Sequence, residues 1–436
     1  MAPDPATYEV TPAEGPLDGD VPLPGSKSLT NRALCLGALA EGASRLDKPL
    51  LADDTLYMVA GLKNLGFKVR KPATSNFIQV QGRGGRIPWD EGRVWAGAAG
   101  TVLRFLLAVL PLGEGVYTID GDARLRKRPI ADLVEALRGL GADIELLGAG
   151  GRALPARVKG GGGLAGGAIS IPGGVSSQFL SALLMAGPVM QEGLDVRVEG
   201  TLTSRPYADL TLRAMSAFGV DVERQGYERF RVPRATYRGM KYTIEGDASA
   251  STYFLAAGAV CGGRVKVTGV GSASVQADTG FARVLETMGA EVQSGPDWIE
   301  VRGRAQGGGV FDLADMPDAA QTLAVTALFA SEPVEIRNVG NLRVKETDRI
   351  HALCAELRKL GGRVEEYDDG LKVHPGASGG ARIETYNDHR MAMAFSVAGL
   401  ALPGVVIEDP GTVSKSFPDF YERLETLTGR KGKRER

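Results

Sequence analysis

Self-similarity constrains the fold of this chain more than any other feature of its 436 residues. One phrase recurs six times: an amphipathic stretch with helical spacing ends in a glycine and runs into a strand-like stretch, as in "ALRGLGADI". Glycine adopts the left-handed backbone after a helix at little cost, so each glycine predicts a helix end. The six glycines, which are separated by 68 to 78 residues, are Gly66, Gly141, Gly219, Gly289, Gly361 and Gly429.

A second phrase has the same period. A polar or small-residue loop opens a strongly apolar helical stretch, as in "PGGVSSQFLSALLMAG". Its six occurrences, 69 to 76 residues apart, are marked by Ser28, Thr101, Ser177, Ser249, Asp318 and Asp388. Since two independent phrases agree, the sequence predicts six repeats of about 70 residues. Alternating stretches between the helices, such as "NFIQVQG", "DVRVEG", "RVKVTGV" and "PVEIRNV", predict strands.

The repeats indicate an α/β (α+β) architecture with three repeats in each of two domains. A helix that is apolar on nearly all faces must be buried, and an amphipathic helix lies outside it or under a sheet. If equivalent repeats point the same way, the starts of the buried helices gather at two domain faces. Helix starts carry unpaired N–H groups and about half a positive charge each. Their convergence on one cleft would bind anions.

Composition excludes several other classes of function. The chain is 43% apolar and 24% charged, and its 51 Lys and Arg nearly cancel its 52 Asp and Glu. With a net charge of -1 there is no global attraction for nucleic acid. We expect no secretory signal, no membrane span, a cytoplasmic location with three buried reduced cysteines, and a solvated basic tail, "GRKGKRER".

Five of the six helix openings bring Lys or Arg to the start of a buried helix, where the helix dipole disfavours a cation. Taken singly, a Ser, Thr or Asp there is usually only a cap, and "KETDR" could be a solvated helix start. Taken together, the cations indicate bound anions, whose attraction offsets the unfavourable interaction between each cation and the helix dipole. The number of cations exceeds the need of one monoanion and favours two small, multiply charged substrates carrying carboxylates and phosphates.

Few groups in these openings could transfer protons: Asp318, Glu346, Lys27 and His389. No Ser-His-Asp order, catalytic cysteine or metal-ligand cluster is evident, so we expect neither a metal nor a cofactor. The chemistry then predicted is proton transfer with electrostatic stabilisation.

The chain resembles the 5-enolpyruvylshikimate-3-phosphate synthases along essentially its full length. The motifs that carry the resemblance, in chain order, are "LPGSKSLTNRAL", "AGTVLR", "RLRKRPI", "GGVSSQFLSALL", "SRPYADLT", "PDAAQTLA", "RVKETDRI", "YNDHRMAMAF" and "SKSFPDF". The resemblance implies a two-domain inside-out α/β barrel. Domain 1 would comprise residues 1–24 and 246–436, and domain 2 residues 25–245, with the active site in the cleft between the domains.

The implied reaction transfers the enolpyruvyl group of phosphoenolpyruvate to the 5-hydroxyl of shikimate 3-phosphate, through a tetrahedral intermediate, with release of inorganic phosphate. This step belongs to the shikimate pathway of aromatic amino acid biosynthesis. The resemblance implies Asp318 as the base for the 5-hydroxyl and Glu346 as the acid for the methylene carbon, with Lys27 sharing this work. We expect the environments of the two carboxylates to push their pKa values apart. We also expect a monomer whose domains close on the substrates.

The resemblance also implies the binding residues. Those for shikimate 3-phosphate are Lys27, Ser28, Arg32, Ser176, Ser177, Gln178, Ser204, Tyr207, Asp318, Asn341 and Lys345. Those for phosphoenolpyruvate are Lys27, Gly100, Arg124, Gln178, Arg349, Arg390 and Lys415. Residues expected to support them are Thr101, Arg104, Asp388 and His389.

Two residues depart from the family pattern. Ala98 replaces a usual Asn and Phe105 a usual Pro, both near the expected phosphoenolpyruvate site. They leave the response to glyphosate, the family's inhibitor, open. Two alternatives to the reaction are the sister transferase that acts on UDP-N-acetylglucosamine and a non-catalytic anion-binding protein of this fold. The sister enzyme typically carries a reactive Cys where this chain has Ala123, and Asp318 and Glu346 argue against a protein that only binds anions.

Overall fold

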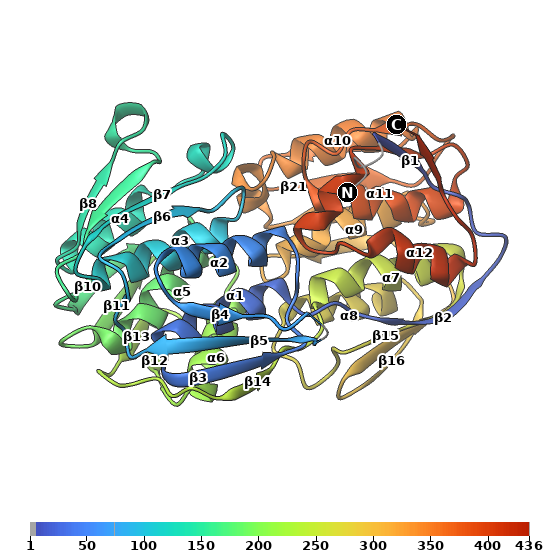
Figure 1. Ribbon diagram of the computed structural model, residues 1–436. Helices are drawn as coiled ribbons and strands as arrows, with labels where there is room; N and C mark the ends of the chain where they lie inside the picture. The colour runs from blue at the N-terminus through green and yellow to red at the C-terminus, as the bar shows by residue number, and fades with distance from the viewer. Residues whose placement is uncertain (1–5, 74, 436) are drawn as a thin grey trace. The chain divides into compact units, whose positions relative to one another are not determined.

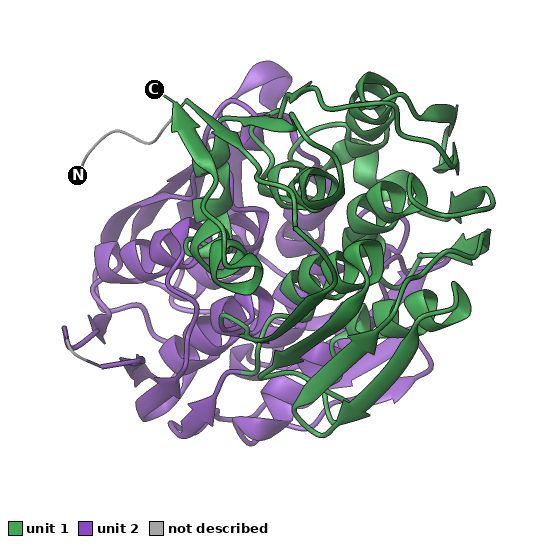
Figure 2. Cartoon of the chain, turned by 90° about the vertical axis from the view of Figure 1, so that its right-hand side faces the viewer, with its two compact units in different colours: residues 1–24, 245–436 green, residues 25–244 purple. Residues whose placement is uncertain are grey.

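The computed structural model describes residues 6–73 and 75–435. The chain forms two compact units, which Figure 2 shows in green and purple. Unit 1 comprises residues 1–24 and 245–436, and unit 2 comprises residues 25–244. The chain therefore returns to unit 1 at residue 245, one residue before the boundary expected from the sequence. Each unit contains three of the six repeats.

One apolar helix lies at the centre of each repeat (Figure 1). These helices are α1 (Lys27–Leu39), α3 (Gly100–Val109) and α5 (Ser177–Ala186) in unit 2, and α7 (Ala248–Cys261), α9 (Ala320–Ala327) and α11 (His389–Ala401) in unit 1. Within each unit the three contact one another. Every residue of α3, α7 and α9 is buried. Of these six helices, only α1, α3 and α11 contain basic side chains, which lie in the first two turns because the rest of each helix is surrounded by apolar neighbours.

An amphipathic helix completes each repeat. These helices are α2 (Asp53–Asn64), α4 (Ala131–Gly139), α6 (Pro206–Ala217), α8 (Phe281–Thr287), α10 (Arg349–Lys359) and α12 (Phe420–Thr428). The six glycines that the sequence marks as helix ends all have positive φ, between 67° and 103°. This prediction is confirmed, and a side chain at these positions would strain the backbone.

The strands form six four-stranded sheets of one design, in which the first pair is parallel and the other two pairs are antiparallel. In unit 2 the sheets are β14-β3-β5-β4 (Lys241–Thr243, Glu41–Asp47, Phe77–Arg83, Lys68–Arg70), β6-β7-β9-β8 (Glu91–Trp95, Val116–Asp120, Ala156–Lys159, Asp143–Leu146) and β10-β11-β13-β12 (Gly167–Pro172, Leu194–Glu199, Arg229–Val232, Glu223–Gln225).

In unit 1 the sheets are β2-β15-β17-β16 (Leu17–Pro22, Gly263–Thr268, Trp298–Arg302, Glu291–Gly295), β18-β19-β21-β20 (Gly309–Asp312, Val334–Arg337, Gly370–His374, Arg363–Tyr367) and β22-β23-β1-β24 (Arg382–Ile383, Val406–Glu408, Thr7–Glu9, Lys433–Glu435). Each of the four strand-like stretches taken from the sequence overlaps a strand: β5, β11, β15 and β19. The sheets and the three inner helices make each unit an α/β fold with its helices inside.

The sequence prediction for the basic tail is wrong in part. Residues Lys433–Glu435 form β24, which pairs antiparallel with β1 from the start of the chain. This pairing provides hydrogen-bond partners for the backbone groups along the free edge of β1. Local composition cannot indicate a contact between segments so far apart in the chain. Among the helices of the described residues, none has both the length and the apolar character that a membrane span requires.

Candidate active site

The expected site residues of unit 2 lie at the starts of its inner helices. Lys27 is the first residue of α1, which Ser26 caps by accepting a bond from the Leu29 backbone N–H. Ser28 is therefore the second residue of the helix and not its cap. The Lys27 ammonium forms an ion pair with Asp54 of α2, at 3.1 Å. Asp54 is buried, so this pair holds the lysine in place at the helix start.

Arg32, one turn further into α1, is fully buried. Its guanidinium donates to the Thr211 hydroxyl (2.8 Å), the Ser181 hydroxyl (3.1 Å) and the backbone oxygens of Ser28 and Tyr207. All of these partners are neutral. Burial lowers the pKa of Arg32 to about 10, which still leaves it charged at neutral pH. Among the described residues no carboxylate lies within ion-pair distance of it, so this is a buried cation with hydrogen bonds but no counter-charge.

The start of α3 brings more cationic groups together. A Cβ atom at Gly100 would lie 2.3 Å from Arg104 Nη1 and 2.9 Å from Arg128 Nη1, so only glycine leaves room for both guanidinium groups. Arg104 donates to the Gln178 side chain at 2.9 Å. The Thr101 hydroxyl accepts a bond from the Asn31 amide, also at 2.9 Å. Thr101 and Arg104 thus connect α3 to the neighbouring helices α1 and α5.

The start of α5 supplies hydroxyls. Ser176 caps the helix by accepting from the Gln178 backbone N–H, and Ser177 is its buried first residue. Ser204 is buried with a φ of 51°, a left-handed backbone that is uncommon for a residue with a side chain. Such a conformation persists only where the surroundings hold it, and it is frequent at ligand sites. Arg124 lies half-buried before the short helix η2 (Leu125–Lys127).

In unit 1, Asp318 occupies a short 3-10 helix, η6 (Pro317–Ala319), directly before α9. Its two oxygens accept from Arg349 Nη1 at 2.9 Å and Arg390 Nη2 at 2.8 Å. Burial would raise the pKa of this carboxyl, but Arg390, Lys345 and Arg349 outweigh burial and hold the pKa well below its usual range. Asp318 is therefore ionised at neutral pH and can accept a proton.

Glu346 lies beside the same cations. It forms ion pairs with Arg349 (2.9 Å) and with Lys415 (3.1 Å), which ends the 3-10 helix η8 (Pro410–Lys415). Lys345 precedes Glu346 in the chain and follows η7 (Gly340–Val344), the element that contains Asn341. The two carboxylates that we expected to act on protons thus share one arginine.

Asp388 and His389 begin α11. Asp388 accepts from the Arg390 backbone N–H as the helix cap, and it also forms an ion pair with Arg349 at 2.7 Å. Burial would lower the pKa of Arg349, but Asp388, Glu346 and Asp318 raise it above its usual range. His389 is fully buried, with Nδ1 3.4 Å from Asp388. The structure therefore gathers seven other predicted residues of unit 1 around Arg349: Asp318, Lys345, Glu346, Asp388, His389, Arg390 and Lys415.

Several residues of these clusters escaped sequence reasoning. Asp54, Ser181 and Thr211 hold predicted site residues, but each stands inside an ordinary helical pattern and only tertiary contacts reveal its role. Asp278, a buried acid of unit 1, is another. The sequence "VQADTG" around it offers no signal beyond an acid in a loop.

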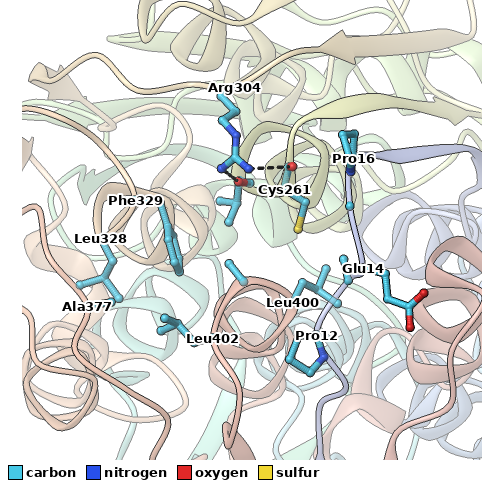
Figure 3. Close-up of a pocket in the computed structure, with 14 residues that line it drawn as sticks. Pro12, Glu14, Pro16, Cys261, Arg304, Leu328, Phe329, Ala377, Leu400 and Leu402 are labelled. Atoms are coloured by element: carbon cyan, nitrogen blue, oxygen red, sulfur yellow. Dashed lines mark hydrogen bonds between the residues drawn. The ribbon is translucent and has the colours of Figure 1, made fainter.

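A cavity of about 430 Å³ lies at the other end of the inner helices of unit 1 (Figure 3). Its lining includes Cys261, Leu328 and Leu400, which lie at the C-terminal ends of α7, α9 and α11. Arg304 donates there to the backbone oxygens of Val260 and Cys261. Helix C-termini repel anions, so this cavity does not suit the predicted substrates. Among the described residues, no group of three or more His, Cys, Asp or Glu side chains could hold a metal ion.

Comparisons with known proteins identify the family of the chain. The family model for EPSP synthase (3-phosphoshikimate 1-carboxyvinyltransferase) matches residues 12–424. The 3-phosphoshikimate 1-carboxyvinyltransferase of Marinomonas sp. (strain MWYL1) is 46% identical over 419 residues, which cover 95% of this chain and 98% of the relative. That of Bordetella bronchiseptica is 48% identical over 430 residues, which cover 95% and 97%. The solved EPSP synthase of Acinetobacter baumannii superimposes with a TM-score of 0.82 at 26% identity, covering 99% of this chain and all of that one.

The family model spans nearly the whole chain, and the two relatives cover 95% of it. The resemblance that the motifs indicated is confirmed. The chain belongs to the EPSP synthase (3-phosphoshikimate 1-carboxyvinyltransferase) family.

Proposed function

We propose that this enzyme transfers the enolpyruvyl group of phosphoenolpyruvate to the 5-hydroxyl of shikimate 3-phosphate and releases inorganic phosphate. Membership of the family over residues 12–424 is the observation that carries the proposal. The cations at the helix starts of both units support it, because both substrates are multiply charged anions.

Within unit 2, we assign the binding of shikimate 3-phosphate to the starts of α1, α5 and α6. Arg32 and Ser28 bind the carboxylate, and Ser176, Ser177 and Ser204 bind the phosphate. Gln178 and Tyr207 contact the ring and its hydroxyls. The uncompensated charge of Arg32 supports this assignment, since an anion would supply the missing counter-charge.

Two residues of unit 1, Lys345 and Asn341, also bind shikimate 3-phosphate. Phosphoenolpyruvate is bound by Arg349, Arg390 and Lys415, together with three groups of unit 2: Lys27, Arg124 and the Gly100 backbone. Gln178 contacts it as well. In this proposal, residues of both units act on one pair of substrates.

The proposed chemistry needs one base and one acid. Asp318, ionised beside its arginines, accepts the proton of the 5-hydroxyl as that oxygen bonds to the central carbon of phosphoenolpyruvate. Glu346 delivers a proton to the methylene carbon, which gives the tetrahedral intermediate, and Lys27 shares the acid–base work. Glu346 then takes a proton back from the new methyl group while the bond between the central carbon and the phosphate oxygen breaks, and the released phosphate takes up the proton that Asp318 accepted.

Three further features belong to the proposal: a cytoplasmic location, a monomeric state and membership of the family that glyphosate targets. The three buried free thiols, Cys35, Cys261 and Cys354, suit a reducing compartment. The two departures from the family pattern have defined neighbours. The Ala98 carbonyl accepts from Arg128 at 3.5 Å, and the Phe105 ring centre lies 5.3 Å from Arg32 Cζ. A glyphosate dose–response curve measures what these departures do.

Phosphate release from the two substrates tests the reaction. The expected result is release of inorganic phosphate that requires both phosphoenolpyruvate and shikimate 3-phosphate. Release only with UDP-N-acetylglucosamine would instead assign the chain to the sister activity. Binding of both anions without any release would favour a non-catalytic protein.

A further inference from the structure

Asp278 is a buried carboxyl in unit 1 that the proposed reaction does not use. It lies in the 3-10 helix η5 (Ala277–Gly280), and 5% of its surface is exposed. Its Oδ1 atom is buried without a hydrogen-bond partner. An unpartnered polar atom in a protein interior costs free energy, so its retention needs a reason.

The loop that carries Asp278 is fixed to the start of α7. Gln276 donates from Nε2 to the Gly246 carbonyl at 2.8 Å and accepts at Oε1 from the Ala248 N–H at 3.2 Å. A Cβ atom on Gly280 would lie 3.5 Å from the sulfur of Met316, two residues before Asp318. Asp278 is thus held between the starts of two inner helices.

The groups that face Asp278 come from three neighbouring elements. Ser249 of α7 forms a hydrogen bond with its carboxyl, and Asp247 is the cap of the same helix. Asp318 faces it from η6 and Arg390 from α11. Burial, then Asp318 and Asp247, raise the pKa of Asp278, while Arg390 and Ser249 lower it. The resulting pKa is about 7.

Other buried carboxylates of this unit are held by cations. Asp388 pairs with Arg349, Glu300 with Arg264 and Arg302, and Glu356 with Lys359. Asp278 forms no ion pair with any residue that the structure describes. Arg390, the cation that lowers its pKa, instead donates to Asp318 at 2.8 Å and to the Tyr253 hydroxyl at 3.2 Å.

We propose that Asp278 is a positioning residue for the pair formed by Arg390 and Asp318. In its neutral form it leaves Arg390 available to an anion. In its ionised form it adds a negative charge beside that arginine and weakens the binding of phosphoenolpyruvate. The inference rests on the proposed function in that it takes Arg390 as a ligand of phosphoenolpyruvate.

The variant Asp278→Asn tests this, because Asn has the shape of the neutral acid and cannot ionise. We measure kcat/KM for phosphoenolpyruvate in variant and parent between about pH 5 and about pH 9. The phosphates of the substrates titrate in the same range, but this cancels in the ratio of variant to parent. We expect a ratio near one at the acidic end that rises to about 10 at the alkaline end, through KM more than kcat.

Two further variants keep the test decisive. Asp278→Ala also cannot ionise and should give the same rise in the ratio even if its overall activity is lower. Glu300→Gln removes a buried carboxylate of the same unit that is paired with two arginines, and its ratio should stay flat. A flat ratio for both Asp278 variants overturns the proposal.

Unfolding provides a readout that does not depend on substrates. A group whose folded pKa is raised contributes stability that is lost as pH rises from its unfolded to its folded pKa. The stability of Asp278→Asn relative to parent should therefore increase between about pH 4 and about pH 7 and then level off. A constant difference overturns the proposal whatever the activity. If the pH-linked difference is found but the parent enzyme releases no phosphate, it is the proposed function that fails.

Discussion

The buried arginines of the two units are held by different kinds of partner. In unit 2, Arg32 donates to two hydroxyls and two carbonyls, all neutral. In unit 1, Arg349 forms ion pairs with Asp318, Glu346 and Asp388. One unit thus keeps an uncompensated positive charge and the other keeps a balanced network of cations and carboxylates.

This difference indicates a division of labour between equivalent ends of one repeated fold. An uncompensated buried cation is costly in the resting protein and is stabilised when an anion binds. A network of ion pairs determines which carboxylates are ionised, and proton transfer depends on this. We therefore expect substitution of Arg32 in unit 2 to affect substrate affinity, and substitution of Asp318 or Arg349 in unit 1 to affect turnover or stability.

The largest effect is expected for Arg349→Gln. It leaves three carboxylates around a neutral side chain, so the free energy of unfolding should fall by about 3–5 kcal/mol. Denaturant unfolding measures this change. A decrease in the free energy of unfolding of less than about 1 kcal/mol would show that Arg349 does not offset the charges of the three carboxylates.

Asp318→Asn tests the chemical part of the comparison. The variant keeps an acceptor for Arg349 and Arg390 but cannot take up the proton, so kcat should fall about 100-fold or more. Binding of both substrates, measured by calorimetry, should largely persist. An equal loss of binding and turnover would show that the carboxylate mainly shapes the site.

Arg32→Gln is the matched change in unit 2. The KM for shikimate 3-phosphate should rise about 30-fold, since a charge-assisted bond to the substrate is lost. Stability should change by less than about 1 kcal/mol, because the partners left behind are neutral and a buried charge is removed. Steady-state kinetics and denaturant unfolding check both parts. A stability loss as large as that of Arg349→Gln would break the comparison between the units.

The smallest effect is expected for Asp54→Asn. Asp54 is the buried partner of Lys27, so its change lets the ammonium move from the start of α1. We expect kcat to fall about 10-fold. The thermal midpoint should fall less than for Arg349→Gln, because one ion pair is lost and not three. The variant Asp53→Asn, at the neighbouring half-buried position of α2, is the control and should lose less turnover than Asp54→Asn. Equal kinetics for the two variants would show that Lys27 needs no such partner.

Much of the fold could be predicted from local patterns. The six glycines with positive φ, the buried inner helices and the strands β5, β11, β15 and β19 follow from backbone conformation and hydrophobic spacing. The pairing of β24 with β1 could not, because the two strands lie at opposite ends of the chain. Edge pairing over such a separation leaves no trace in local composition.

The candidate site divides in the same way. The residue types and their positions at helix starts are visible in the sequence, since repeats place them at equal intervals. The pairs are not visible there. Lys27 with Asp54 joins two helices of one repeat, and Arg32 with Thr211 and Asp278 facing Arg390 join separate repeats.

The sequence by itself therefore determined the sixfold repeat, the ends of its helices, the cations at the openings and, through its motifs, the family. These features depend on spacing and residue type, which a linear chain displays directly. Only the tertiary structure decided which cations are balanced by carboxylates and which acid is left without a cation. Charge balance depends on distances of a few ångströms between distant segments, and burial determines how strongly each charge acts.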